Sequence, residues 1–445
     1  MNTPTQYTYK EIGLIAYPIL ISLLMEQLIG MTDTAFMGRV GEVELGASAL
    51  AGIYYLIIFM MGFGFSIGAQ ILIGRRNGEK NYRQIGGIFY QGILFLSFLA
   101  VCMIAFSLLF SPHILRHIIQ SEDIYQATLS YINWRVYGFL FSFAGTMFRA
   151  FFVGTTQTKT LTLNSVVMVL SNILFNYILI FGKCGFPAMG IAGAAVGSCL
   201  AELMSLLFFI LYTYRHIDYR KYGLHRFHGF QKDILKRIFQ VSFWTMIQNG
   251  ISMSTWFLFF IAVEHLGERP LAITNIIRNV SAIPFMTTAA FASTCSTLVS
   301  NLIGAGKTKY VKGTIRQVVW ITYGAVFPIT ILFLLFPEQT LHIYTDSTEL
   351  IQSAIPALWV LCTTYIPQVP GQIYFQAVSG TGNTRMAFQL EIATLCIYVA
   401  YVIYTVLYLK IDVALCWTTE HVYGTFIFLF SWLYIKRGNW RNKTI

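Results

Sequence analysis

The sequence predicts an all-α polytopic membrane protein whose twelve transmembrane helices form two six-helix bundles related by a pseudo-two-fold axis along the membrane normal. Three observations lead to this prediction. Of the 445 residues 56% are hydrophobic and only 11% are charged, whereas soluble domains carry about 25% charged residues. The chain divides into twelve apolar runs of membrane length, and short motifs recur at one offset in its two halves.

Each apolar run has about 20 residues or more, which is the length that crosses a bilayer as a helix. Several runs exceed the hydrocarbon thickness, and helices of that length tilt or extend beyond it. We expect helices near 12–37, 45–74, 86–110, 123–152, 160–182, 190–214, 238–265, 271–303, 314–336, 348–379, 384–409 and 412–435.

An internal repeat accounts for the division into halves. GTTQTK at 154–159 recurs 226 residues later as GTGNTR, and RRNGEKN after the second run has a counterpart in IGAGKTK after the eighth. Six spans in each half make both halves enter the membrane in the same sense, as in transporters built from parallel repeats. We therefore expect an N-terminal lobe at 1–214, a cytoplasmic basic linker at 215–237 and a C-terminal lobe at 238–445.

The net charge of +11 fits a membrane protein because cytoplasmic loops carry an excess of Lys and Arg. Placing both termini in the cytoplasm puts most of the 30 Lys and Arg residues on that side. The N-terminal segment lacks the pattern of a cleaved signal peptide. We expect a multi-pass protein of the cytoplasmic membrane that binds no nucleic acid.

No motif in the sequence supports an enzyme activity. IGAGKTK ends like a phosphate-binding loop, but Asn301 stands where that loop needs its first glycine. No HExxH or DDxxD occurs, the one GxSxG match (GFSIG at 64–68) lies inside an apolar run, and the seven cysteines are scattered singly. We expect no enzyme activity, no cofactor and no disulfide.

Five carboxylates interrupt the apolar runs. Glu26 and Asp33 lie seven residues apart, two helical turns, so they share roughly one helix face. Acids inside a span normally face a bundle interior or wet cavity and bind ions or protons. Glu202, Glu391 and Glu420 are the other three, the last two as secondary candidates. For each acid the alternative is a structural carboxyl that is hydrogen-bonded inside the bundle.

Amides add to the polar face. Asn172 and Asn176 are four residues apart on the fifth run, so they project from one side of that helix. Oxygen ligands suit a hard cation such as sodium. A neutral hydrogen bond between helices explains either amide equally well.

Four stretches of the chain carry a resemblance to a known family. They are MTDTAFMGRVGEVELGASALAG from 31, GAQILIGRRNGE from 68, LSNILFNYILIFG and PAMGIAGAAVGS within 170–198, and TNIIRNVSAIPFM from 274. With these motifs the sequence resembles the multidrug and toxic compound extrusion (MATE) family over essentially its whole length. The resemblance implies a V-shaped pair of six-helix bundles, alternating access, and export of organic compounds driven by sodium or protons.

The resemblance is nearer to the DinF-like branch of the family than to the NorM-like branch, and it implies roles for particular residues. Asp33 matches the helix-1 aspartate at the centre of the N-lobe cation site, and Asn172 matches an asparagine of that site. Asn176 stands where an aspartate is often found, and Ser198 where a threonine is often found. The change at Asn176 removes a charge, which leaves Glu26 or Glu202 to replace it.

We therefore expect a cation- or proton-coupled antiporter that exports organic, mainly cationic, multidrug-type compounds. Its partners are the small organic substrate, sodium or protons, and the lipid bilayer. A flippase of lipid-linked precursors is the first alternative, and a non-transporting scaffold or sensor is the second. Sodium needs about five or six oxygens, while a proton needs one carboxyl, so Glu26 near Asp33 favours a proton slightly. Sodium at Asp33 is the only metal that we consider.

Overall fold

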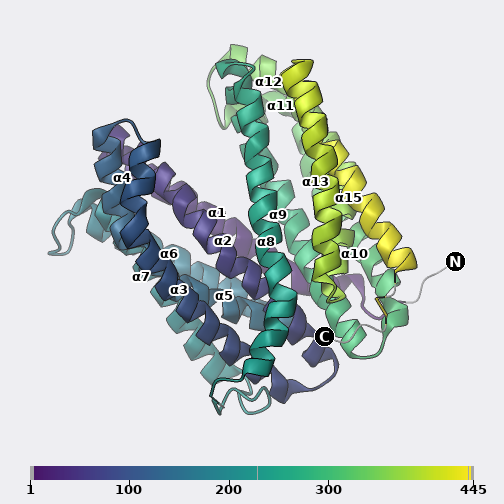
Figure 1. Cartoon of the computed structure of the whole chain (residues 1–445). Coiled ribbons are helices and arrows are strands. Elements are labelled where there is room, and N and C mark those ends of the chain that lie inside the picture. The colour runs from purple at the N-terminus through teal and green to yellow at the C-terminus, as the bar shows by residue number, and fades with distance from the viewer. Residues whose placement is uncertain (1–4, 228, 439, 442–445) are drawn as a thin grey trace. The chain divides into compact units, whose positions relative to one another are not determined.

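The computed structural model describes residues 5–227, 229–438 and 440–441, and every regular element within them is a helix (Figure 1). The helices up to residue 264 are α1 (Tyr9–Val40), α2 (Glu42–Gly78), α3 (Tyr82–Ile118), α4 (Glu122–Arg135), α5 (Gly138–Gly154), α6 (Lys159–Phe181), α7 (Gly190–His216) and α8 (Lys232–Glu264). Those after it are α9 (Glu268–Gly304), η1 (Thr308–Tyr310), α10 (Val311–Leu335), α11 (Pro337–His342), α12 (Thr348–Gly380), α13 (Thr384–Val402), η2 (Ile403–Tyr408), α14 (Val413–Cys416) and α15 (Thr418–Arg437).

Among the residues described, eleven helical segments are long and apolar enough to cross a membrane, and α4 with α5 makes a twelfth if that bent pair is one span. The predicted all-helical membrane fold is confirmed, and each predicted run coincides with one of these segments. The run expected at 123–152 is not one straight helix, because α4 and α5 meet at an angle of 53°. The break lies between Arg135 and Gly138, where no proline marks it in the sequence.

The chain forms two compact units. The first, here called the N-unit, is Ile21–Met246, and the second, the C-unit, combines Met1–Leu20 with Ile247–Ile445. The chain therefore passes between units inside α1 and inside α8, whereas the predicted lobes were divided at 215–237. Pro18 precedes the passage in α1 by two residues, and its ring removes one backbone hydrogen bond of the helix there.

Within the N-unit, α6 packs on α7, and α5 packs on both α2 and α3. The first half of α8 is attached to α2 by side chains that bond to its backbone. Ser242 donates to the Phe65 carbonyl at 2.9 Å, and Thr245 donates to the Gly64 carbonyl at 2.7 Å. A Cβ atom on Gly68 would lie 2.5 Å from the Ser242 Cα atom, so this close approach requires glycine.

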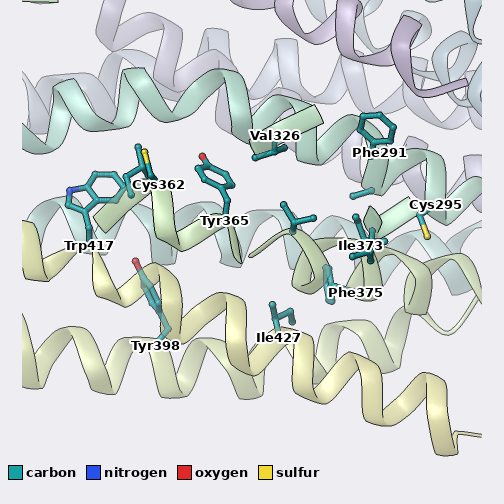
Figure 2. Close-up of a cluster of buried hydrophobic side chains, with 14 of the residues drawn as sticks. Phe291, Cys295, Val326, Cys362, Tyr365, Ile373, Phe375, Tyr398, Trp417 and Ile427 are labelled. Atoms are coloured by element: carbon teal, nitrogen blue, oxygen red, sulfur yellow. The ribbon is translucent and has the colours of Figure 1, made fainter. Parts of the chain in front are cut away.

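Within the C-unit, α12 is central and packs on α9, α10, α13 and α15. Figure 2 shows part of the core, in which Phe291, Tyr365 and Trp417 are buried among aliphatic side chains. The backbones of α12 and α15 nearly touch, since a Cβ on Gly371 would lie 2.8 Å from the Gly424 carbonyl oxygen. Small residues permit this kind of packing between membrane helices.

The internal repeat reappears in the local geometry of both units. Helices α2 and α9 each have 37 residues and begin 226 residues apart. After them, Lys80 has φ 59° and Gly306 has φ 69°. The same offset joins Thr156, with φ 62°, to Gly382, with φ 84°. Left-handed backbone at paired positions shows that the two halves turn their chains alike.

The recurring motifs also place a glycine at a helix crossing in each unit. A Cβ on Gly154 would lie 3.0 Å from the Gln70 carbonyl oxygen, and one on Gly380 would lie 2.4 Å from the Ser296 carbonyl oxygen. Gln70 and Ser296 are again 226 residues apart. The repeated GT dipeptide therefore preserves a contact between backbones.

The first prediction concerns these glycines. Gly380→Ala should lower the thermal midpoint of the purified protein, because the new methyl group meets backbone that cannot rotate away, at a cost of about 1–3 kcal/mol. Gly154→Ala should lower it less, because its contact is longer. Gly324→Ala in α10 is the matched control, since nothing lies within 4 Å of its Cβ position. Equal midpoints for Gly380→Ala and Gly324→Ala would contradict the prediction.

Candidate coupling site

A chain of polar side chains links three helices of the N-unit. Asn176 of α6 donates its Nδ2 to Asp33 Oδ1 of α1 at 2.6 Å and lies 3.2 Å from Asn172 Oδ1 one turn earlier. Asn172 donates in turn to Ser198 Oγ of α7 at 3.3 Å. Four residues that the sequence predicts for the coupling site are thus brought together.

Close packing of α6 on α7 makes these contacts reachable. A Cβ on Gly193 would lie 2.6 Å from the Leu179 carbonyl oxygen, and one on Gly197 would lie 2.2 Å from Asn176 Oδ1. The two glycines form a GxxxG pattern, which lets membrane helices approach closely. Ser198 follows the second glycine and reaches Asn172 for that reason.

One acceptor atom in this series of hydrogen bonds receives no donor. Asn172 and Asn176 are 1% and 0% exposed, Ser198 is buried and Asp33 is half-buried. Asn176 Oδ1 is buried with no hydrogen-bond partner among the residues described, and such a group is costly to leave unpaired. The site therefore offers a carboxylate together with an unused amide oxygen, which is a set that can accept a proton donor or a hard cation.

Glu202, also predicted for the site, forms an ion pair with an arginine side chain. Arg135, the last residue of α4, donates Nη1 to Glu202 Oε2 at 2.9 Å and Nη2 to Oε1 at 2.6 Å. The two side chains are 11% and 7% exposed. A bidentate pair of this kind is the strongest arrangement of arginine with a carboxylate.

Three residues that the sequence analysis missed enclose this pair. The guanidinium lies 3.6 Å from the Tyr55 ring centroid, and the Tyr55 hydroxyl donates to Glu202 Oε1 at 2.9 Å and lies 3.0 Å from Ser142 Oγ. A Cβ on Gly138 would lie 2.4 Å from Glu202 Oε2. The α4–α5 break thus puts a glycine beside the pair. Tyr55 is one of 26 tyrosines, so sequence alone does not distinguish it.

The Arg135–Glu202 ion pair interacts electrostatically with Asp33. The charges of Arg135 and Glu202 both act on Asp33, and Tyr131 interacts with Asp33 and Arg135. We call Asp33, Tyr55, Arg135, Asn172, Asn176, Ser198 and Glu202 the N-unit polar cluster.

Glu26 is held elsewhere. Its Oε1 accepts from Arg149 Nη1 of α5 at 3.1 Å, and its side chain is 53% exposed. Two helical turns separate it from Asp33 by about 10 Å along α1. The structure thus gives Glu26 and Asp33 separate partners, and the expectation of a proton favoured by their proximity loses its basis.

The C-unit acids have hydroxyl partners. Glu391 of α13 is 1% exposed and accepts from Ser252 of α8 at 2.7 Å and from Tyr423 of α15 at 3.0 and 3.2 Å. Glu420 accepts from Tyr398 at 3.3 Å. Within the described part of the chain neither acid has an ion-pair partner. Glu391 therefore joins three helices through hydroxyl groups.

Replacing Glu391 tests that structural contribution. Glu391→Ala leaves two half-buried hydroxyls without this acceptor, and we expect a loss of stability of up to about 1–3 kcal/mol for each one left unpaired. Glu391→Gln retains an acceptor oxygen and should lose less. Thermal midpoints in detergent measure both, with Glu349→Ala as the control because that side chain is 80% exposed. Equal midpoints for the Ala and Gln variants would show that these hydrogen bonds do not hold the helices together.

A second prediction concerns the buried pair of the N-unit. Glu202→Ala should destabilise the protein by about 3–5 kcal/mol, because it leaves the Arg135 charge buried and uncompensated. The double variant Arg135→Met/Glu202→Met should be far more stable than the single variant, since no isolated charge remains. Chemical or thermal unfolding of the two proteins measures the difference. A double variant no more stable than Glu202→Ala would contradict this account.

Comparison with known proteins places the chain in a family. The sequence model of the MatE family matches residues 18–178 and again 244–406, well over half of the chain and once in each half. A Thermotoga maritima protein named probable multidrug resistance protein NorM is 26% identical, over 84% of this chain and 80% of its own length. The probable multidrug resistance protein YoeA of Bacillus subtilis is 24% identical, over 84% and 82%.

A solved structure agrees with the fold. An outward-facing structure of a multidrug resistance MATE family transporter of the MOP superfamily superposes with a TM-score of 0.88, at 17% identity, over 98% of this chain and 97% of the other. The relatives named NorM and YoeA do not resolve the branch, so the nearer likeness to the DinF-like branch stays a prediction. The chain belongs to the MATE family of multi-pass membrane transporters, and it is not an enzyme.

Proposed function

We propose that this protein is an antiporter of the cytoplasmic membrane that exports organic compounds, and that Asp33 carries its coupling ion. The observation that supports this best is the state of Asp33 inside the membrane-length helix α1. No basic side chain pairs with it among the residues described, and its hydrogen-bond partner Asn176 has an unused oxygen. An intramembrane acid of this kind is by default a site for an ion or proton.

We infer the direction of transport and the substrate class from the relatives. Two of them are named as multidrug resistance proteins, which supports export of organic compounds by this chain. That these compounds are mainly cationic stays a prediction from the sequence. We propose that both termini are cytoplasmic, as the distribution of Lys and Arg favours. We further propose that the protein works without a cofactor other than the coupling ion.

Occupation of Asp33 would change what holds α1 to α6. The ionised carboxylate accepts a charge-assisted hydrogen bond from Asn176, and such bonds are about twice as strong as neutral ones. A proton or sodium ion on the carboxylate weakens that bond and biases the N-unit toward a second arrangement, because a ligand shifts an equilibrium by its differential affinity for the two states. One charge that crosses 100 mV supplies about 2.3 kcal/mol before any concentration gradient.

The test is substrate flux in proteoliposomes with proton and sodium gradients imposed separately. Wild-type protein should move an organic cation under at least one gradient, and Asp33→Asn should lower the driven rate by about tenfold or more, since it removes the carboxylate charge at which we propose that the ion binds. Asp123→Asn, an exposed carboxylate at the start of α4, is the matched control. Wild-type flux in the Asp33→Asn variant would refute the assignment, and no flux by wild type would favour the scaffold or sensor.

A further inference from the structure

Resting on the proposed function, we propose that Arg135 determines the ion specificity of the Asp33 site. It acts as a tethered cation that engages both oxygens of Glu202 and so makes the site select a proton over sodium. Arg135 would thus be a specificity-determining residue that acts through Glu202.

The first step is that the Arg135 charge is fixed in place. The guanidinium makes two hydrogen bonds to Glu202 at 2.6 and 2.9 Å and lies 3.6 Å from the Tyr55 ring centroid. It stands at the break between α4 and α5, where a Cβ on Gly138 would come within 2.3 Å of Nη1. Arginine keeps its proton in proteins. Its positive charge is therefore a permanent part of the surroundings of Asp33.

The second step is charge balance. The N-unit polar cluster contains two acids and one arginine, so it carries one net negative charge while Asp33 is ionised and no ion is bound. Among the residues described, Tyr131 and Cys199 also interact electrostatically with this network and, like Tyr55, are neutral in their protonated forms. A single monovalent positive ion makes the cluster neutral, and both a proton and sodium satisfy this condition.

The third step separates the two ions by their need for ligands. Sodium requires several oxygens at once. Glu202 is a poor source of one, because each of its oxygens already accepts from Arg135, whose positive charge repels a second cation, and Oε1 accepts from Tyr55 as well. Asn176 directs its NH₂ group, not its oxygen, toward Asp33. A proton needs one carboxylate oxygen only, so Arg135 removes the second acid from any sodium shell and leaves the proton site intact.

A purely structural pair would behave differently. If Arg135 and Glu202 only joined α4 to α7, then releasing Glu202 would change stability without changing which ion drives transport. The ratio of sodium-driven to proton-driven flux is therefore the informative measurement, because a general loss of folded protein lowers both fluxes together.

The experiment measures that ratio in proteoliposomes for wild type, Arg135→Gln and Arg135→Gln/Glu202→Gln. Wild type should be driven by the proton gradient. Arg135→Gln releases the Glu202 carboxylate, and the ratio should shift toward sodium by about tenfold or more, because an added charged ligand strengthens cation binding. The double variant should lose most of that gain. An unchanged ratio in Arg135→Gln, or a gain that persists without the Glu202 carboxylate, would overturn the proposal.

Two further measurements keep the proposal testable if a variant does not fold or if the wild-type protein shows no flux. Wild-type protein driven equally well by sodium alone would overturn the proposal without any variant. Sodium chloride, compared with choline chloride, should raise the thermal midpoint of Arg135→Gln and not that of wild type. This measurement of sodium binding remains valid if the wild-type protein shows no flux. An absence of flux would refute only the proposed antiport. A sodium-dependent rise in the thermal midpoint of wild type would refute the role of Arg135 in ion specificity.

Discussion

The bidentate pair between Arg135 and Glu202 is the interaction on which the N-unit depends most. Two charges withdrawn from water are costly unless their geometry is good and their remaining hydrogen-bonding groups find partners. The structure meets this condition with a break between α4 and α5, a glycine at 138 and a tyrosine ring against the guanidinium. These local features have one shared consequence, which is that a pair of opposite charges is buried where both charges act on Asp33.

The two units provide different kinds of partner for their intramembrane acids. The N-unit pairs Glu26 and Glu202 with arginines and leaves Asp33 with an amide donor. In the C-unit, Glu391 accepts from the hydroxyl groups of Ser252 and Tyr423. The backbone nevertheless repeats between halves, down to left-handed residues that are 226 positions apart. The repeat therefore preserves how the chain turns and crosses, while the charged residues are specific to each half.

Features that depend on residues close together in the sequence could be predicted, whereas contacts between residues far apart in the sequence could not. The helices were predictable because the length of an apolar run is a local property. Asn172 and Asn176 share a face by their spacing, Asp33 was identified as an acid inside an apolar run, and the resemblance added Ser198. The partner of Glu202 was not predictable, since Arg135 lies 67 residues away in the sequence and only the packing of α4 on α7 brings it close. The α4–α5 break has no proline to mark it, and the passage of α1 between the units is likewise a matter of packing.

Glu26 shows why spacing along one helix does not define a site. Residues seven apart share a face, yet about 10 Å of helix separates them, and each side chain then bonds to what lies opposite its own turn. Opposite Glu26 is Arg149 of α5, while opposite Asp33 is Asn176 of α6. Interactions between charges weaken with distance and with every closer countercharge. An acid paired at 3.1 Å with its own arginine therefore contributes little to the charge balance at Asp33, and the second acid that matters there is Glu202, which comes from another helix.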